Sequence, residues 1–181
     1  AIIRGLVGSE MCIRDSSHFN PTDTLCVRPS SESLDWGGPG AVLNIGMNDE
    51  RCSHLSKHIG EKSASELYFR FIQAYSVNVA RLDPDVFDHI TRANGNSVSA
   101  ALAAYKDEMD ESFPQSIEHQ LSEVLRSMAR AWEGTSARLL REAKGAPADA
   151  GLGLVIQKMA FGVGDGESGS GVLQLVNSDT G

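Results

Sequence analysis

The sequence predicts an α+β fold in which a mostly helical subdomain is flanked by short strands. Two glycine-rich turns, WGGPGAVLNIGMND at 36–49 and FGVGDGESGSGV at 161–172, each stand beside a short apolar run that is typical of a strand. Between them, residues 50–145 mostly show apolar side chains at helical spacing. Strand-held turns at both ends of a helical region indicate one site built from both ends of the chain.

The expected elements follow the chain in order. Residues 23–27 predict a strand, which ends at a loop rich in serine and glycine over 31–40. Asp83 and Pro84 suit a helix start, because Asp can cap the first turn and Pro needs no donor there. The other helices are expected over 62–80, 97–108, 114–132 and 136–143. Runs rich in branched and long apolar side chains predict strands over 152–160 and 171–176. Arg141 is expected on the exposed side of the last helix.

Composition limits the function classes. The chain has 181 residues and a formal net charge of -8, which suits one domain or a piece of one. The acidic balance argues against a nucleic-acid binder, which would carry a basic patch. No run of about 18 apolar residues occurs, so no transmembrane helix is expected. Three cysteines without a CxxC motif favour a reducing cytoplasm.

Several short motifs, in order, resemble the N-terminal ATP-grasp domain of the pyruvate phosphate dikinase family. LCVR at 25–28 and VLNIGMND at 42–49 resemble that family's "VRSGA" and "VLNLGLND". FIQ at 71–73 and FPQ at 113–115 resemble its "RRFIQMFG" and "FPQDPYEQL". The run at 157–172 is similar to "VQAMVFGNMGDDSGTGV". The resemblance covers the chain from about residue 25 to its end.

This resemblance implies both a fold and an activity. Residues 17–181 would form an incomplete ATP-grasp nucleotide-binding domain, with its helical subdomain at about 50–145. The whole parent would be a cytoplasmic homodimeric phosphotransferase that uses ATP and Mg²⁺. It would phosphorylate a carrier His, and then convert pyruvate to phosphoenolpyruvate with orthophosphate as co-substrate. The family's Lys motif, acidic metal ligands and carrier His have no match here, so this chain alone is expected to be inactive.

Binding residues are carried over position by position. Arg28 and Arg70 match arginines of the family and would contact phosphate, since a guanidinium pairs well with phosphate oxygens. Gln157 and Met159 would line the adenine pocket. Backbone N–H groups of the two turns would cradle phosphate, at Gly37, Gly38, Gly169, Ser170 and Gly171. No catalytic residue and no metal ligand is assigned within the chain. The plain alternatives are surface arginines and ordinary strand packing.

Departures from the family pattern favour a second interpretation. Glu32 replaces the second arginine of "VRSGAR", and LVNS at 175–178 replaces the "TRDP" phrase. A carboxylate in a phosphate pocket repels the ligand unless it points away or meets a cation. The alternative function is a divergent, non-catalytic nucleotide-sensing or interaction module of the same fold.

Two other segments call for a separate interpretation. LVGSEMCIRDS at 6–16 reads like a translated sequencing adapter, so residues 1–16 are treated as an artefact segment without a place in the fold. His54 and His58 stand four residues apart near Cys52, as on a zinc-binding helix. No fourth ligand is evident, so an exposed helical face is the preferred interpretation.

Overall fold

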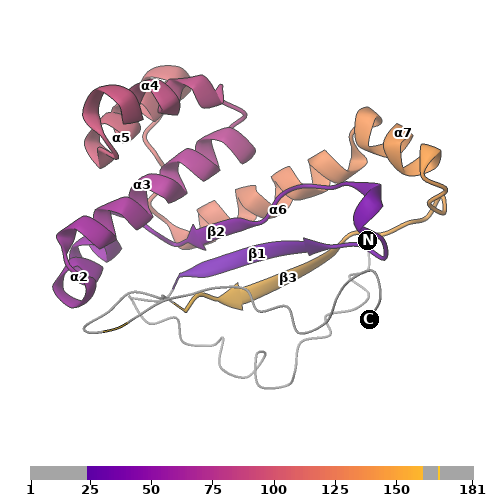
Figure 1. Cartoon of the computed structure of the whole chain (residues 1–181), viewed down its shortest axis with the longest axis horizontal. Coiled ribbons are helices and arrows are strands. Elements are labelled where there is room, and N and C mark those ends of the chain that lie inside the picture. Colours follow the sequence, from indigo (N-terminus) through magenta and orange to yellow (C-terminus); the bar gives the residue numbers. More distant parts are fainter. Residues whose placement is uncertain (1–23, 161–166, 168–181) are drawn as a thin grey trace.

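The computed structural model describes residues 24–160 and residue 167, and its architecture is mixed α+β (Figure 1). Its three described strands form one antiparallel sheet in the order β2-β1-β3. The strands are β1 (Leu25–Ser30), β2 (Val42–Ile45) and β3 (Gly153–Lys158), and a short 3-10 helix, η2 (Leu34–Trp36), follows β1. The described α-helices are α2 (Asp49–Ile59), α3 (Glu61–Asn78), α4 (Pro84–Asn94), α5 (Val98–Met109), α6 (Ile117–Glu133) and α7 (Thr135–Ala143).

Register is set differently on the two sides of β1. Against β3 the pairing is unbroken, from Leu25 opposite Lys158 to Ser30 opposite Gly153. Against β2 it carries a bulge, because two residues of β2 face the single residue that separates Leu25 and Val27 on β1. The second of these two is Asn44, whose φ of 61° is left-handed. This bulge lets β2 turn at once into the helical region.

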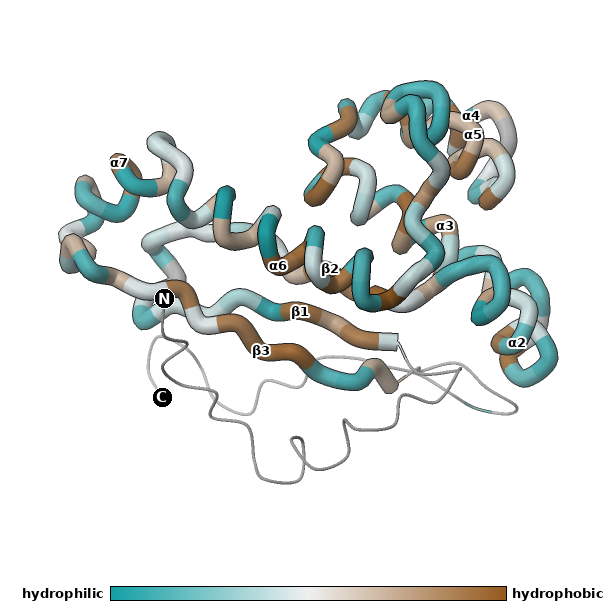
Figure 2. Tube along the Cα trace, turned by 180° about the vertical axis from the view of Figure 1, so that it is seen from behind, coloured by the Kyte–Doolittle hydropathy of each residue, from teal (hydrophilic) through white to brown (hydrophobic). Residues whose placement is uncertain are grey.

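One face of the sheet packs against α3 and α6. The core residues of β1 and β2 join the apolar faces of these helices in a single cluster. Phe113, from the segment before α6, lies at its aromatic centre, with ring centroids 5.1 Å from Tyr105, 5.3 Å from Tyr75 and 5.8 Å from Phe71. Figure 2 shows apolar colours along β1 and β3 and hydrophilic colours over much of α2. The helices therefore cover one side of the sheet only.

The local start signals of the helices are confirmed. The Asp83 side chain accepts a hydrogen bond from the Asp85 N–H at 3.0 Å, and Pro84 occupies the first turn of α4. Ser97 and Ser116 cap α5 and α6 in the same way. These caps satisfy N–H groups that have no partner inside the helix.

Most expected boundaries lie within about three residues of the observed ones, as is usual for helix ends. The apolar run after the first glycine turn is β2, and the helix expected around His54 and His58 is α2. β1 continues to Ser30, so Arg28 lies within the strand and not after it. The strand expected over 171–176 and the artefact segment 1–16 lie outside the described residues. The proposed domain division therefore stays a prediction.

Candidate functional site

The sheet has a second face that points away from α3 and α6. Leu25 and Val27 enter the core, so the alternating residues Cys26 and Arg28 point to the opposite side. Antiparallel partners share a face, and Cys26 and Arg28 lie opposite Gln157 and Val155. We call this side the outer face, with Thr24, Cys26, Arg28, Val155, Gln157 and Met159 as its members.

The ladder continues beyond β3 at Met159. Its N–H donates to the Thr24 carbonyl at 2.8 Å, so Met159 stands beside Thr24 as Gln157 stands beside Cys26. The Thr24 side chain is fully buried, and its Oγ1 has no hydrogen-bond partner among the described residues. A buried hydroxyl without a partner is a group that a bound ligand or water can satisfy.

The structure brings together three of the site residues predicted from sequence. Arg28, Gln157 and Met159 all lie on the outer face, and diagonal neighbours such as Arg28 and Gln157 have side chains about 7–8 Å apart at their bases. Arg28 and Gln157 are exposed, Met159 is half-buried, and Arg28 makes no ion pair within the part of the chain that is described. The outer face thus offers a cation and an amide along an apolar strip.

Arg70 does not join this group. It lies on α3, which packs on the other face of the sheet through residues such as Phe71 and Ile72. Its guanidinium is exposed and pairs with Glu66 at 2.6 Å, one helical turn away. Gly169, Ser170 and Gly171 lie outside the described residues, so the second glycine turn stays a prediction.

Gly37 and Gly38 lie against the end of the helical layer. Their φ angles of 68° and 151° are ones that other residues rarely adopt. A Cβ at Gly37 would stand 3.0 Å from the Leu140 side chain, and one at Gly38 would stand 3.6 Å from the Trp132 ring. Packing against α6 and α7 is therefore a sufficient reason for glycine at both positions.

Trp132 and Arg141 hold this end of the molecule together. The Arg141 guanidinium carbon lies 3.8 Å from the centroid of the Trp132 ring, and Arg141 Nη1 donates to the Trp132 carbonyl at 2.7 Å. The indole N–H donates to the Ala150 carbonyl at 3.3 Å, in the segment that leads to β3. We call this pair the Trp132–Arg141 stack.

The stack corrects one expectation. Arg141 was expected on the exposed side of its helix, and that prediction is wrong, because only 7% of Arg141 is exposed. A guanidinium that stacks on an indole and bonds to a buried carbonyl can be buried without losing its partners. The stack contacts both the first glycine turn and the entry to β3, so it fixes the two halves of the candidate site.

Gln120 joins the motifs at 42–49 and 113–115. This fully buried side chain accepts a hydrogen bond from the Gly46 N–H at 2.7 Å. Its amide nitrogen donates to the carbonyls of Met47 at 3.0 Å and Pro114 at 2.7 Å. We call this arrangement the Gln120 clamp. Sequence reasoning placed Gln120 in a matched motif but gave it no role.

A second network lies beside the clamp. Gln115 Oε1 accepts from the Asp49 N–H at 3.0 Å, and its carbonyl accepts from Asn48 Nδ2 at 2.9 Å. The Tyr68 hydroxyl donates to Asp49 Oδ1 at 3.0 Å and accepts from Gln115 Nε2 at 3.2 Å. Burial raises the pKa of the Tyr68 phenol, so it stays a neutral donor. The matched phrases "LND" and "FPQ" thus contact each other and stabilise the fold.

The residues 24–160 and 167 contain no group of three His, Cys, Asp or Glu side chains arranged to hold a metal ion. The His54 and His58 rings lie 5.2 Å apart on α2. Burial raises the pKa of the nearby Cys52 thiol, which keeps it in the protonated form that binds metals poorly. Within the described segment, no helix has the length and apolar character needed to cross a membrane.

Comparison with known proteins gives consistent relatives. No protein-family model matches the chain. Among curated proteins, it is 30% identical over 174 residues to the pyruvate, phosphate dikinase of Clostridium symbiosum, which covers 86% of this chain and 20% of that protein. It is 30% identical over 175 residues to the enzyme of Rhizobium meliloti, covering 87% and 20%, and 27% identical over 174 residues to a chloroplastic enzyme of Zea mays, covering 87% and 18%. The chain thus spans about a fifth of the length of these relatives.

Proposed function

Since the chain is a distant homologue of the pyruvate, phosphate dikinases, we propose that it forms part of the ATP-binding region of such a phosphotransferase, with a partial ATP-grasp fold. The nucleotide would lie over the outer face of the sheet. One observation carries this proposal: the register of β1 and β3 places Arg28, Gln157 and Met159 on the same face.

Each group on this face suits a part of ATP. The Arg28 guanidinium is a strong partner for phosphate oxygens, and no described carboxylate competes for it. Met159 and Gln157 offer an apolar contact and an amide for a base. The unpartnered Thr24 hydroxyl beside Met159 adds one possible hydrogen bond. The described residues show no ligand set for Mg²⁺, so we propose that its ligands lie elsewhere in the protein.

We extend the proposal to the whole enzyme. ATP would phosphorylate a carrier His, and that phosphoryl group would convert pyruvate to phosphoenolpyruvate, with orthophosphate as the other substrate and the protein acting as a homodimer. In such transfers, most of the catalysis comes from cations that clamp the phosphoryl group. The free thiols of Cys26 and Cys52 support the cytoplasm as the compartment.

Glu32 supports a second candidate function. It is exposed in the loop that follows β1, the strand that carries Arg28. A carboxylate there weakens an anion site unless a cation meets it. A non-catalytic nucleotide-sensing or interaction module would tolerate this loss. Phosphoryl transfer from ATP to a His by the intact protein decides between the two functions.

We predict that Arg28→Ala weakens ATP binding by the intact protein. A charge-assisted hydrogen bond contributes roughly 1.5–3 kcal/mol, so the dissociation constant should rise roughly ten- to a hundred-fold. Calorimetric titration with ATP and Mg²⁺ measures this. Arg138→Ala on α7 is the matched control, because Arg138 is exposed and should have little effect. Equal affinities for Arg28→Ala and the parent would remove Arg28 from the site.

A further inference from the structure

Arg81 adopts an unusual backbone conformation just after α3. Its φ is 65°, in the left-handed region. This conformation lets the Leu82 N–H bond back to the Ser76 carbonyl at 3.0 Å, which closes the end of the helix. Glycine usually takes this role, because a Cβ is unfavourable in the left-handed region. The fold alone therefore favours glycine at position 81, and the arginine side chain needs another explanation.

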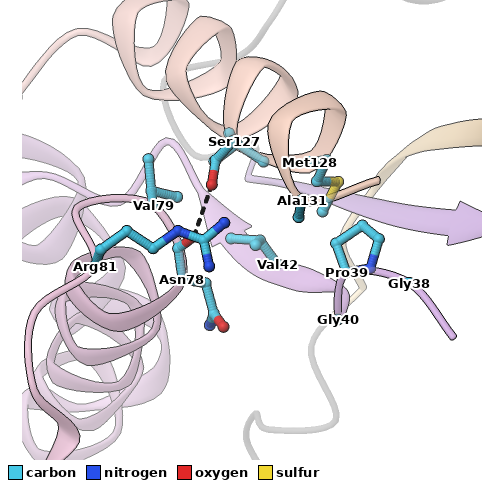
Figure 3. Close-up of a pocket in the computed structure, with 11 residues that line it drawn as sticks. Gly38, Pro39, Gly40, Val42, Asn78, Val79, Arg81, Ser127, Met128 and Ala131 are labelled. Carbon is cyan, nitrogen blue, oxygen red and sulfur yellow. Dashed lines mark hydrogen bonds between the residues drawn. The ribbon is translucent and has the colours of Figure 1, made fainter. Parts of the chain in front are cut away.

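The Arg81 side chain extends over a pocket of about 260 Å³ (Figure 3). The pocket lies between the first glycine turn, the end of α3 and α6. Its lining residues are Gly38, Pro39, Gly40, Val42, Asn78, Val79, Arg81, Val124, Ser127, Met128 and Ala131. Arg81 is exposed and forms no ion pair among the described residues. Its charge is therefore available to a ligand.

The other polar groups of the pocket are already engaged. Ser127 Oγ donates to the Asn78 carbonyl at 2.7 Å, as Figure 3 shows, and Asn78 Nδ2 donates to the Ala74 carbonyl at 2.9 Å. Much of the remaining lining is apolar, including Val42 and Met128. One free guanidinium over an apolar floor suits an anion that also has an apolar body.

The pocket is separate from the outer face. Val42 and Val124, which line it, belong to the core between the sheet and the helices. Arg28 points to the opposite side of the sheet. A ligand here would leave the proposed nucleotide face free.

We propose that this pocket binds a small organic carboxylate, with the carboxylate paired to Arg81 and the apolar body against Val42, Val124 and Met128. The volume is below the range of about 300–1,000 Å³ that is usual for drug-sized ligands, so the ligand is small. Orthophosphate fits less well, because it needs several donors, whereas the Ser127 hydroxyl and the Asn78 amide each already donate to a carbonyl.

Titration of the intact protein with butyrate, followed by NMR chemical-shift changes, tests this proposal. The parent should bind butyrate with a dissociation constant on the order of millimolar. Arg81→Gly should weaken binding at least ten-fold, while the melting temperature stays equal or rises, because glycine suits this backbone position. Arg92→Ala on α4 is the control, because Arg92 is an exposed arginine away from the pocket lining.

Several outcomes would overturn the proposal. No saturable binding of butyrate by the parent would do so, as would equal binding by Arg81→Gly. Tighter binding of orthophosphate than of butyrate would overturn the carboxylate assignment. A lower melting temperature of Arg81→Gly would show that arginine is kept at this position for the fold. None of these results depends on ATP binding, so the proposed nucleotide site succeeds or fails separately.

Discussion

Gln120→Leu is expected to destabilise the protein by about 3 kcal/mol or more, because it leaves three buried backbone groups without partners and each costs about 1–3 kcal/mol. These groups are the Gly46 N–H and the carbonyls of Met47 and Pro114. Leucine has nearly the volume of glutamine, so packing changes little and the lost hydrogen bonds dominate. Urea unfolding followed by tryptophan fluorescence measures the loss.

Gln73→Leu on α3 is the matched control for the clamp. Gln73 is half-buried and makes no hydrogen bond with another described side chain or backbone group, so its replacement should stay within about 0.5 kcal/mol of the parent. If Gln120→Leu unfolds at the same urea concentration as Gln73→Leu, the clamp does not stabilise the fold and its role must be sought elsewhere.

Arg141→Ala is expected to cost about 2–3 kcal/mol, because it removes a cation–π contact and a charged hydrogen bond to a buried carbonyl. The loss should also be local. Amide exchange should become faster in the first glycine turn and near Ala150, which the Trp132–Arg141 stack holds together. Thermal unfolding and exchange measured by mass spectrometry report the two effects.

Arg141→Lys separates charge from shape in this prediction. Lysine keeps the positive charge but lacks the planar guanidinium, so it should recover only part of the lost stability. Arg138→Ala, one turn earlier and exposed, should change little. A full recovery by lysine would show that charge alone matters, and unchanged exchange near Ala150 in Arg141→Ala would disprove the anchoring role of the stack.

The clamp and its neighbouring network change the meaning of the motif matches. Two of the phrases that carry the family resemblance contain Asp49 and Gln115, which bond to each other and to Tyr68. These matches therefore report a shared fold. Evidence for a shared site rests on fewer residues, mainly Arg28, Gln157 and Met159, which no such network engages.

The sequence by itself determined the elements whose signals are local. Asp83, Pro84, Ser97 and Ser116 start helices where predicted, because a cap acts through N–H groups two or three residues away. The apolar spacing located the core faces of α3 and α6 for the same reason, since a helix repeats over a few residues. The motif order also indicated the relatives.

Only the tertiary structure decided which distant residues meet. The register of β1 and β3 placed Arg28 near Gln157, the Gln120 clamp joined residues more than 70 positions apart, and Arg141 was buried against an exposed-helix expectation. No local pattern encodes these outcomes. Burial and pairing depend on which surfaces pack together, and a side chain is called exposed or buried only once its neighbours from the rest of the chain are in place.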